Sequence, residues 1–111
     1  MEDFLLKQAR ARGLADERGL YLAANVFADE KQLGRVWAFL NGRKLLLAEL
    51  ELPAGVGRDL GMIELSGAKA EVKRFLIPLS LTLETARGRF SFQGFRDAKR
   101  WLSAVLAAVE Q

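Results

Sequence analysis

Residues 79–110 read LSLTLETARGRFSFQGFRDAKRWLSAVLAAVE, and the spacing of the apolar residues changes at Gly94. Before Gly94, apolar and polar residues alternate, as in Leu81-Thr82-Leu83 and in Phe90-Ser91-Phe92. A period of two predicts strands with one buried face, and the intervening Ala86-Arg87-Gly88 predicts the turn that joins them. The segment before Gly94 is therefore expected to form a β-hairpin.

After Gly94, apolar residues recur every three or four positions, which predicts an amphipathic helix over residues 96–110. Trp101 lies on the apolar stripe of this helix. A tryptophan in such a stripe is most often part of a core, so we expect Trp101, together with Phe90 and Phe92, to be structural. The helix must then bury its stripe against the strands that precede it.

The middle of the chain is expected to supply the remaining strands. Asn41-Gly42 separates the apolar runs 35–40 and 43–52, and an Asn-Gly pair in that setting predicts a tight hairpin. Shorter runs at 62–65 and 68–72 predict two more strands. Residues 20–27 are apolar enough for a buried strand, although Leu-Ala-Ala within them also suits a helix.

Two loops and a second helix complete the expected layout. Charged residues predict a loop at 29–32, and a proline with two glycines predicts another at 53–59. Residues 2–12 have apolar side chains on one face and are followed by Gly13, which predicts a short amphipathic helix. The predicted domain, residues 1–111, is mainly β and has three parts: an N-terminal helical extension (1–13), a seven-stranded antiparallel β-sandwich (20–94) and a capping α-helix (96–110).

Composition argues against catalysis. The 111 residues include no cysteine and no histidine, which removes thiolate nucleophiles, the commonest zinc ligands and the usual proton carrier at neutral pH. We therefore expect no enzyme, no metal and no cofactor. The balance of 17 basic and 14 acidic side chains gives a net charge of only +3, which does not predict a nucleic-acid partner.

The apolar residues also bear on location. No run of 18 apolar residues occurs, and charges interrupt the first 12 residues, so neither a membrane span nor a signal peptide is expected. These features predict a cytoplasmic protein. Abundant Ala, Arg, Gly and Leu, without Cys or His, suggests a bacterial source.

Three stretches resemble the pleckstrin homology superfamily. Gly34–Leu40 followed by Leu45-Leu46-Leu47 is similar to the second and third strands of that family, and Gly61–Leu65 is similar to its fourth strand. Residues 81–102 resemble its final hairpin and helix, with Trp101 at the place of the family's tryptophan. The resemblance covers roughly residues 20–110 and implies a non-catalytic module that binds lipids or proteins, or that self-associates.

The phosphoinositide-binding members of the family use a lysine near the end of the first strand and an arginine in the second. Arg35 matches the arginine, but Val26 or Phe27 stands at the lysine position. Asp29 and Glu30 lie in the loop between, where their charges oppose a phosphorylated headgroup. Specific phosphoinositide binding is therefore not expected.

Two groups of residues are candidates for binding. Lys31, Arg35, Arg43 and Lys44 are a candidate site for a phosphate, an anionic lipid or an acidic peptide, the alternative being a solvated surface. Trp37 and Phe39 share one face of a strand that is apolar on both faces, so they are either buried or a candidate interface for a partner.

We accordingly predict a protein-interaction, self-association or regulatory module, a scaffold that could form a homodimer. One alternative is peripheral, weak contact with anionic lipid or binding of a phosphorylated small ligand. Another is an N-terminal regulatory domain of a larger protein. Residues 64–68 faintly resemble a motif of cyclic di-GMP-binding PilZ domains, but the upstream Arg-x-x-x-Arg pair of that family is absent.

Overall fold

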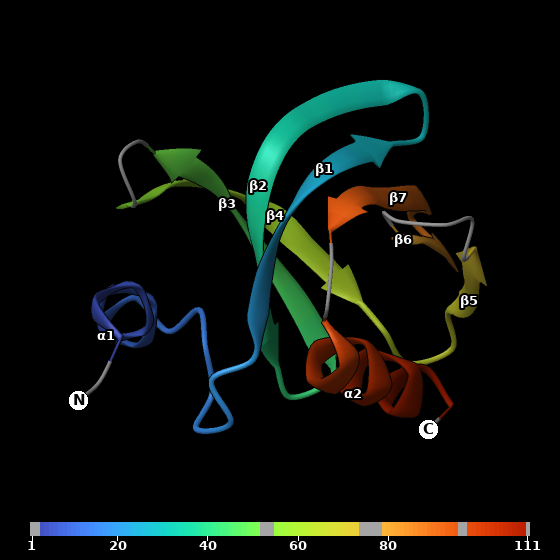
Figure 1. Ribbon diagram of the computed structural model, residues 1–111. Helices are drawn as coiled ribbons and strands as arrows, with labels where there is room; N and C mark the ends of the chain where they lie inside the picture. Colours follow the sequence, from blue (N-terminus) through green and yellow to red (C-terminus); the bar gives the residue numbers. More distant parts are fainter. Residues whose placement is uncertain (1–2, 52–54, 74–78, 96–97, 111) are drawn as a thin grey trace.

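The computed structural model describes residues 3–51, 55–73, 79–95 and 98–110 (Figure 1). Seven strands form one antiparallel sheet in the order β4-β3-β2-β1-β7-β6-β5. A mainly β fold with a C-terminal helix and a short N-terminal helix is what the sequence predicts, and this prediction is confirmed. The elements are α1 (Phe4–Ala11), β1 (Tyr21–Ala28), β2 (Lys31–Asn41), β3 (Lys44–Glu51), β4 (Gly55–Glu64), β5 (Lys69–Lys73), β6 (Leu79–Thr85), β7 (Gly88–Phe95) and α2 (Lys99–Val109).

Strand β2 is apolar on both faces, and each face is covered by a different helix. Val36 and Ala38 point inward, are fully buried, and belong to the main core with α2. Trp37 and Phe39 point outward into a second cluster that α1 shares. Figure 1 shows α1 and α2 on opposite sides of the strands β1–β4. Strands β1–β4 therefore lie between two helices that come from opposite ends of the chain.

Trp101 of α2 fixes the main core. Its side chain is 2% exposed, and its indole Nε1 donates a hydrogen bond to the Ala38 carbonyl at 3.2 Å. Its ring meets Phe92 and Phe95 edge-on, with centroids 5.9 Å apart in both pairs. Phe90 is half-buried and packs against the same core. One side chain thus joins α2 to both β2 and β7.

The predicted loop at 53–59 is wrong over residues 55–59, because β4 begins at Gly55. Its backbone runs so close to β3 that a Cβ on Gly57 would lie 3.0 Å from the side chains of Glu49 and Glu51. Glycine is what permits this close pairing, so it extends the strand here instead of ending it. Residues 52–54 lie outside the described residues.

The extent of the loop between the first two strands also differs from the sequence prediction. The loop expected at 29–32 is only a two-residue turn, because β2 already begins at Lys31. Asp29 adopts a left-handed backbone, with φ at 56°, which lets β1 reverse directly into β2. The segment that suited either a strand or a helix is strand β1, paired on both sides by β2 and β7.

Replacing Trp101 tests the role of this side chain. Trp101→Ala should lower the free energy of unfolding by about 3–5 kcal/mol, because it leaves a large cavity beneath α2. Trp101→Phe should cost about 1–3 kcal/mol, since it keeps a ring but removes packed volume and the hydrogen bond from Nε1 to the Ala38 carbonyl. Urea unfolding followed by circular dichroism measures both values.

Lys99→Ala is the matched control on the same helix, because Lys99 is exposed. It should change stability by less than about 0.5 kcal/mol. A loss for Trp101→Ala no larger than that of the control would contradict this account of the core.

Candidate functional site

The four basic residues predicted as one ligand site are not brought together. Lys31 and Arg35 lie in the first half of β2, whereas Arg43 and Lys44 lie at the β2–β3 turn beyond its other end. Ten residues of extended chain separate Lys31 from the turn, a contour of roughly 33 Å. The four cations therefore form two separate pairs on the surface.

A carboxylate occupies the end of the sheet where β1 turns into β2. Asp29 Oδ1 accepts a hydrogen bond from the backbone N–H of Arg89 at 3.1 Å, and the Asp29 N–H donates to the Arg89 carbonyl at 2.6 Å. A Cβ on Gly88 would lie 3.0 Å from the Asp29 carboxylate. The β1–β2 turn is thus locked onto the β6–β7 turn by a negative group, which opposes the approach of a phosphate.

The aromatic face predicted as a partner interface is covered within the chain. Phe39 is fully buried, and Trp37 is half-buried with its Nε1 donating to the Gly55 carbonyl at 2.8 Å. The covering side chains come from α1 and from the segment that follows it: Leu5, Ala9, Leu14 and Ala15. With α1 in place, Trp37 and Phe39 offer little surface to a partner.

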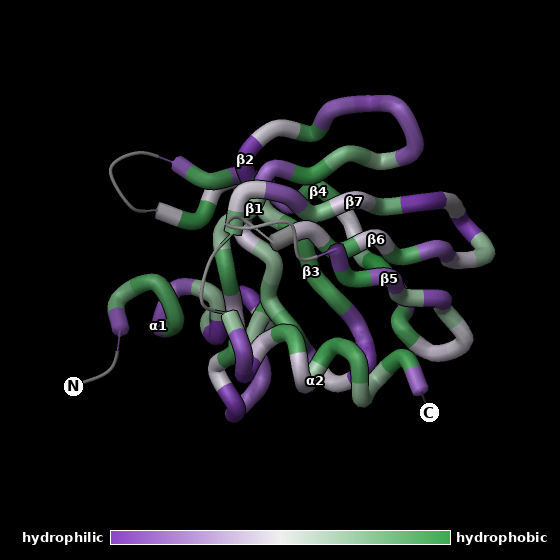
Figure 2. The backbone as a smooth tube through the Cα atoms, turned by 45° about the vertical axis from the view of Figure 1, so that its right-hand side comes forward, coloured by the Kyte–Doolittle hydropathy of each residue, from purple (hydrophilic) through white to green (hydrophobic). Residues whose placement is uncertain are grey.

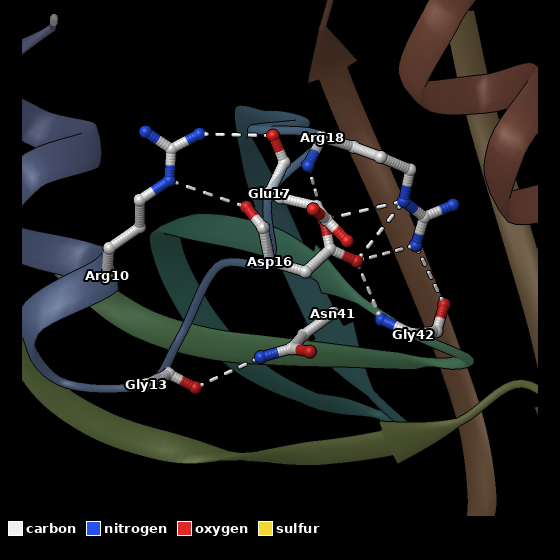
Figure 3. Close-up of polar contacts among 7 residues, drawn as sticks. All are labelled: Arg10, Gly13, Asp16, Glu17, Arg18, Asn41 and Gly42. Atoms are coloured by element: carbon white, nitrogen blue, oxygen red, sulfur yellow. Dashed lines mark hydrogen bonds and ion pairs between the residues drawn. The ribbon is translucent and has the colours of Figure 1, made fainter.

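We call α1 and the segment that follows it, up to Ala15, the α1 cover. Contacts among Asp16, Arg18 and Gly42, which we call the polar clasp, hold the α1 cover against the sheet (Figure 3). The Asp16 carboxylate accepts from the Gly42 N–H at 2.9 Å and from the Arg18 guanidinium at 2.8 Å, and Arg18 also donates to the Gly42 carbonyl. Asn41 donates to the Gly13 carbonyl beside it. The clasp ties the chain after α1 to the β2–β3 turn.

The clasp sets the pKa of Asp16. Partial burial alone would raise it, but hydrogen bonds from the Arg18 side chain and from the backbone N–H groups of Gly42 and Arg18 outweigh burial and hold the pKa below its ordinary value of 3.8. The free energy of the clasp is therefore fully present above the unfolded-state pKa and is lost as pH falls through the lower folded-state pKa.

The other side of α1 is fastened to β4 and β1. Arg12 forms an ion pair with Asp59 at 2.6 Å and donates to the Val56 carbonyl at 2.9 Å. Tyr21 donates its hydroxyl proton to Asp3 in a short hydrogen bond. Burial, followed by this bond and the charge of Asp3, raises the pKa of Tyr21 to about 12, and the same bond lowers the pKa of Asp3. The contacts that attach α1 to the sheet therefore explain these shifted pKa values.

An apolar groove of about 370 Å³ remains open elsewhere, between the end of β4 and the β6–β7 turn. We call it the Arg87 groove. Ile63 forms part of its lining and is 1% exposed, while Met62 is 37% exposed and Phe90 is half-buried. The complete lining comprises Met62, Ile63, Glu64, Ser66, Gly67, Ala68, Thr85, Ala86, Arg87 and Phe90.

Both walls of the groove are fixed by local hydrogen bonds. On one wall, Thr85 Oγ1 accepts from the Arg87 N–H and donates to the Gly88 carbonyl, both at 3.1 Å. On the other wall, the Ala68 N–H donates to the Leu65 carbonyl at 3.1 Å across the turn that contains Gly67. The groove is thus held between two tight turns, and the Asp29 contacts brace the first of them.

No catalytic arrangement is assembled in the part of the chain that the structure describes. It contains no buried polar or charged side chain, and no group of three or more His, Cys, Asp or Glu residues that could hold a metal ion. Neither α1 nor α2, the helices described, is long and apolar enough to span a membrane. The Arg87 groove is one concave and mostly apolar part of the surface that this part of the chain presents.

Seven antiparallel strands closed by a C-terminal helix over an apolar core define a mainly β domain. The fold is pleckstrin-homology-like. The crystal structure of the pleckstrin homology domain of ArhGAP27 superposes with a TM-score of 0.59 at 19% sequence identity, over 81% of this chain and 99% of that one. No protein-family model matches the sequence, and no curated protein matches it either. The structural likeness extends to the fold alone.

Breaking the clasp tests whether it holds α1 over the aromatic face. Asp16→Ala should destabilise the protein by about 1–2 kcal/mol, because three donors lose a partly exposed carboxylate. Trp37 should become more accessible to acrylamide, measured in a Trp101→Phe background. Below pH 4, wild-type stability should fall more steeply than that of Asp16→Asn, which has no carboxylate to protonate.

Glu17→Ala is the matched control, because only the backbone carbonyl of Glu17 contacts Arg10 in the described structure. Glu17→Ala should leave the acrylamide quenching of Trp37 and the loss of stability below pH 4 unchanged. Equal quenching of Trp37 in Asp16→Ala and in wild type would show that the clasp does not hold the cover.

Proposed function

We propose that the chain is a non-catalytic protein-interaction module and that the Arg87 groove is its binding site. The observation that carries the proposal is an open, mostly apolar groove whose two walls are fixed turns. A volume of about 370 Å³ lies near the lower end of the range for ligand sites, roughly 300–1,000 Å³. A groove of that size accommodates one large side chain with its neighbouring backbone.

The position of the groove in the sheet favours a peptide. β4 and β5 are the terminal strands of the sheet order, and no strand pairing joins them in the described residues. One edge of β4 therefore has no strand partner, and Met62–Glu64 at its end line the groove. An extended peptide can hydrogen-bond to such an edge while a side chain enters the groove.

A catalytic role has no support from the arrangement of residues. The shifted pKa values of Asp3, Asp16 and Tyr21 are explained by the contacts that fasten α1. None of the three residues lines the groove. We therefore propose that the protein is not an enzyme and needs no cofactor.

The other functions predicted from the sequence have weaker support. Anionic lipid would need converging cations, and Lys31 and Arg35 lie far along β2 from Arg43 and Lys44. Self-association through Trp37 and Phe39 would require α1 to leave its face. A role as an N-terminal regulatory domain of a larger protein, and a cytoplasmic location, stay predictions from the sequence.

Selection from a random peptide library tests the proposal directly. Phage-displayed peptides panned on the immobilised protein should include binders, and their synthetic versions should shift NMR amide signals of Gly67, Ala86 and Phe90. Such shifts are expected because these residues line the groove. Binders that shift only signals elsewhere, or a library without binders, would remove the groove as the binding site.

Vesicle cosedimentation tests the lipid alternative. Binding to vesicles with 20 mol% phosphatidylserine should stay at the level of neutral vesicles at low and at physiological salt, because the cations are dispersed. A Lys31→Glu and Arg35→Glu double variant should behave like wild type. Salt-sensitive binding that this variant loses would establish the lipid function instead.

A further inference from the structure

The charges at the rim of the Arg87 groove bear on the kind of partner that fits. Arg87 is exposed at the tip of the β6–β7 turn, and its guanidinium makes no ion pair or hydrogen bond with any described residue. The backbone at Arg87 is held in place, because the Arg87 N–H donates to Thr85 Oγ1. A cation without an ion pair among the described residues thus stands beside an apolar surface.

The acidic residue of the groove, Glu64, has a cation across the strand pair. Glu64 lies at the end of β4, directly opposite Lys44 in the β3–β4 register. The Cβ atoms of cross-strand neighbours lie about 5 Å apart, so Lys44 is close enough to offset part of the field of Glu64. On the side of the β6–β7 turn, Glu84 already faces Arg89, with 4.0 Å between the ionic groups. Arg87 is thus the cation among the residues that line the groove; the Asp29 carboxylate lies outside this lining, where it accepts a hydrogen bond from the Arg89 N–H.

We propose that the groove recognises a linear peptide segment in which a large apolar residue stands next to an acidic one. The apolar side chain lies against Met62, Ala68 and Phe90, and the acidic side chain pairs with the Arg87 guanidinium. Arginine can hold a carboxylate through two parallel hydrogen bonds, which adds direction to the contact. This inference rests on the proposed function, since it specifies the partner of the same groove.

Short synthetic peptides of defined charge test the inference. Fluorescein-labelled Ser-Gly-Asp-Phe-Gly-Ser and its Phe-Asp counterpart are titrated with the protein and followed by anisotropy. At least one of the two orders should bind, with amide shifts at Gly67, Ala86 and Arg87. Peptides with Lys in place of Asp, or Ala in place of Phe, should bind roughly tenfold more weakly, because each lacks one of the two contacts.

Charge reversal distinguishes recognition from structural damage. Arg87→Glu should invert the preference, so that the Lys-Phe peptide binds better than the Asp-Phe peptide. Arg100→Glu makes the same change of charge at an exposed position on α2, away from the groove, and should keep the wild-type preference. Equal binding of acidic and basic peptides to wild type, or no inversion in Arg87→Glu, would overturn the inference.

Three further measurements distinguish this inference from other occupants of the groove and from the proposed function. If 3-phenylpropionate competes with an affinity equal to that of the peptide, the groove is a small-molecule site and the peptide assignment fails. If sedimentation shows a dimer that Arg87→Glu abolishes, the occupant is a second copy. If library-selected peptides bind the groove without any charge preference, the proposed function stands and only the acidic partner is refuted.

Discussion

The structure depends on one strand that is apolar on both of its faces. The alternating side chains of β2 put Val36, Ala38 and Leu40 on one face and Trp37 and Phe39 on the other. A solvated antiparallel sheet has one apolar face, so β2 would leave a large aromatic patch in water if a single helix covered the sheet. The chain therefore supplies a helix at each end, and the strands lie between them.

The two helices, α1 and α2, are held against the sheet by different kinds of interaction. α2 is buried through Trp101 and an apolar stripe, so its attachment depends on the same packing as the core itself. α1 has only eight residues, and polar contacts at its rim supplement its apolar contacts (Figure 3). Contacts of that kind contribute little each and depend on pH and salt. The α1 cover is consequently the part of the fold that acid below pH 4 or a single clasp mutation should loosen first.

The local sequence pattern predicted most of the helices and strands, but not which of them contact one another. The period-two alternation of β6 and β7, the Asn41-Gly42 turn and the apolar stripe of α2 act over a few residues, and the predicted strands, turn and helix are present. Figure 2 shows α2 as a mainly hydrophobic segment. The start of β4 was missed because glycine usually interrupts a strand, whereas Gly57 permits close pairing with β3. Whether Trp37 and Phe39 are buried or exposed depends on a contact with α1, which lies about 30 positions earlier in the sequence. Spacing within β2 carries no information on such a contact.

The Arg87 groove follows from the way the sheet ends. A sheet that bends around its core leaves a gap wherever its terminal strands fail to pair, and here β4 and β5 do not pair in the described residues. The Ser66-Gly67 and Ala86-Arg87 turns are each evident as turns in the sequence, but only the bending of the sheet makes them face each other across Phe90. A groove of this origin need not contain any recognisable motif. The specificity proposed for it rests on the few side chains at the gap, among which Arg87 is the cation.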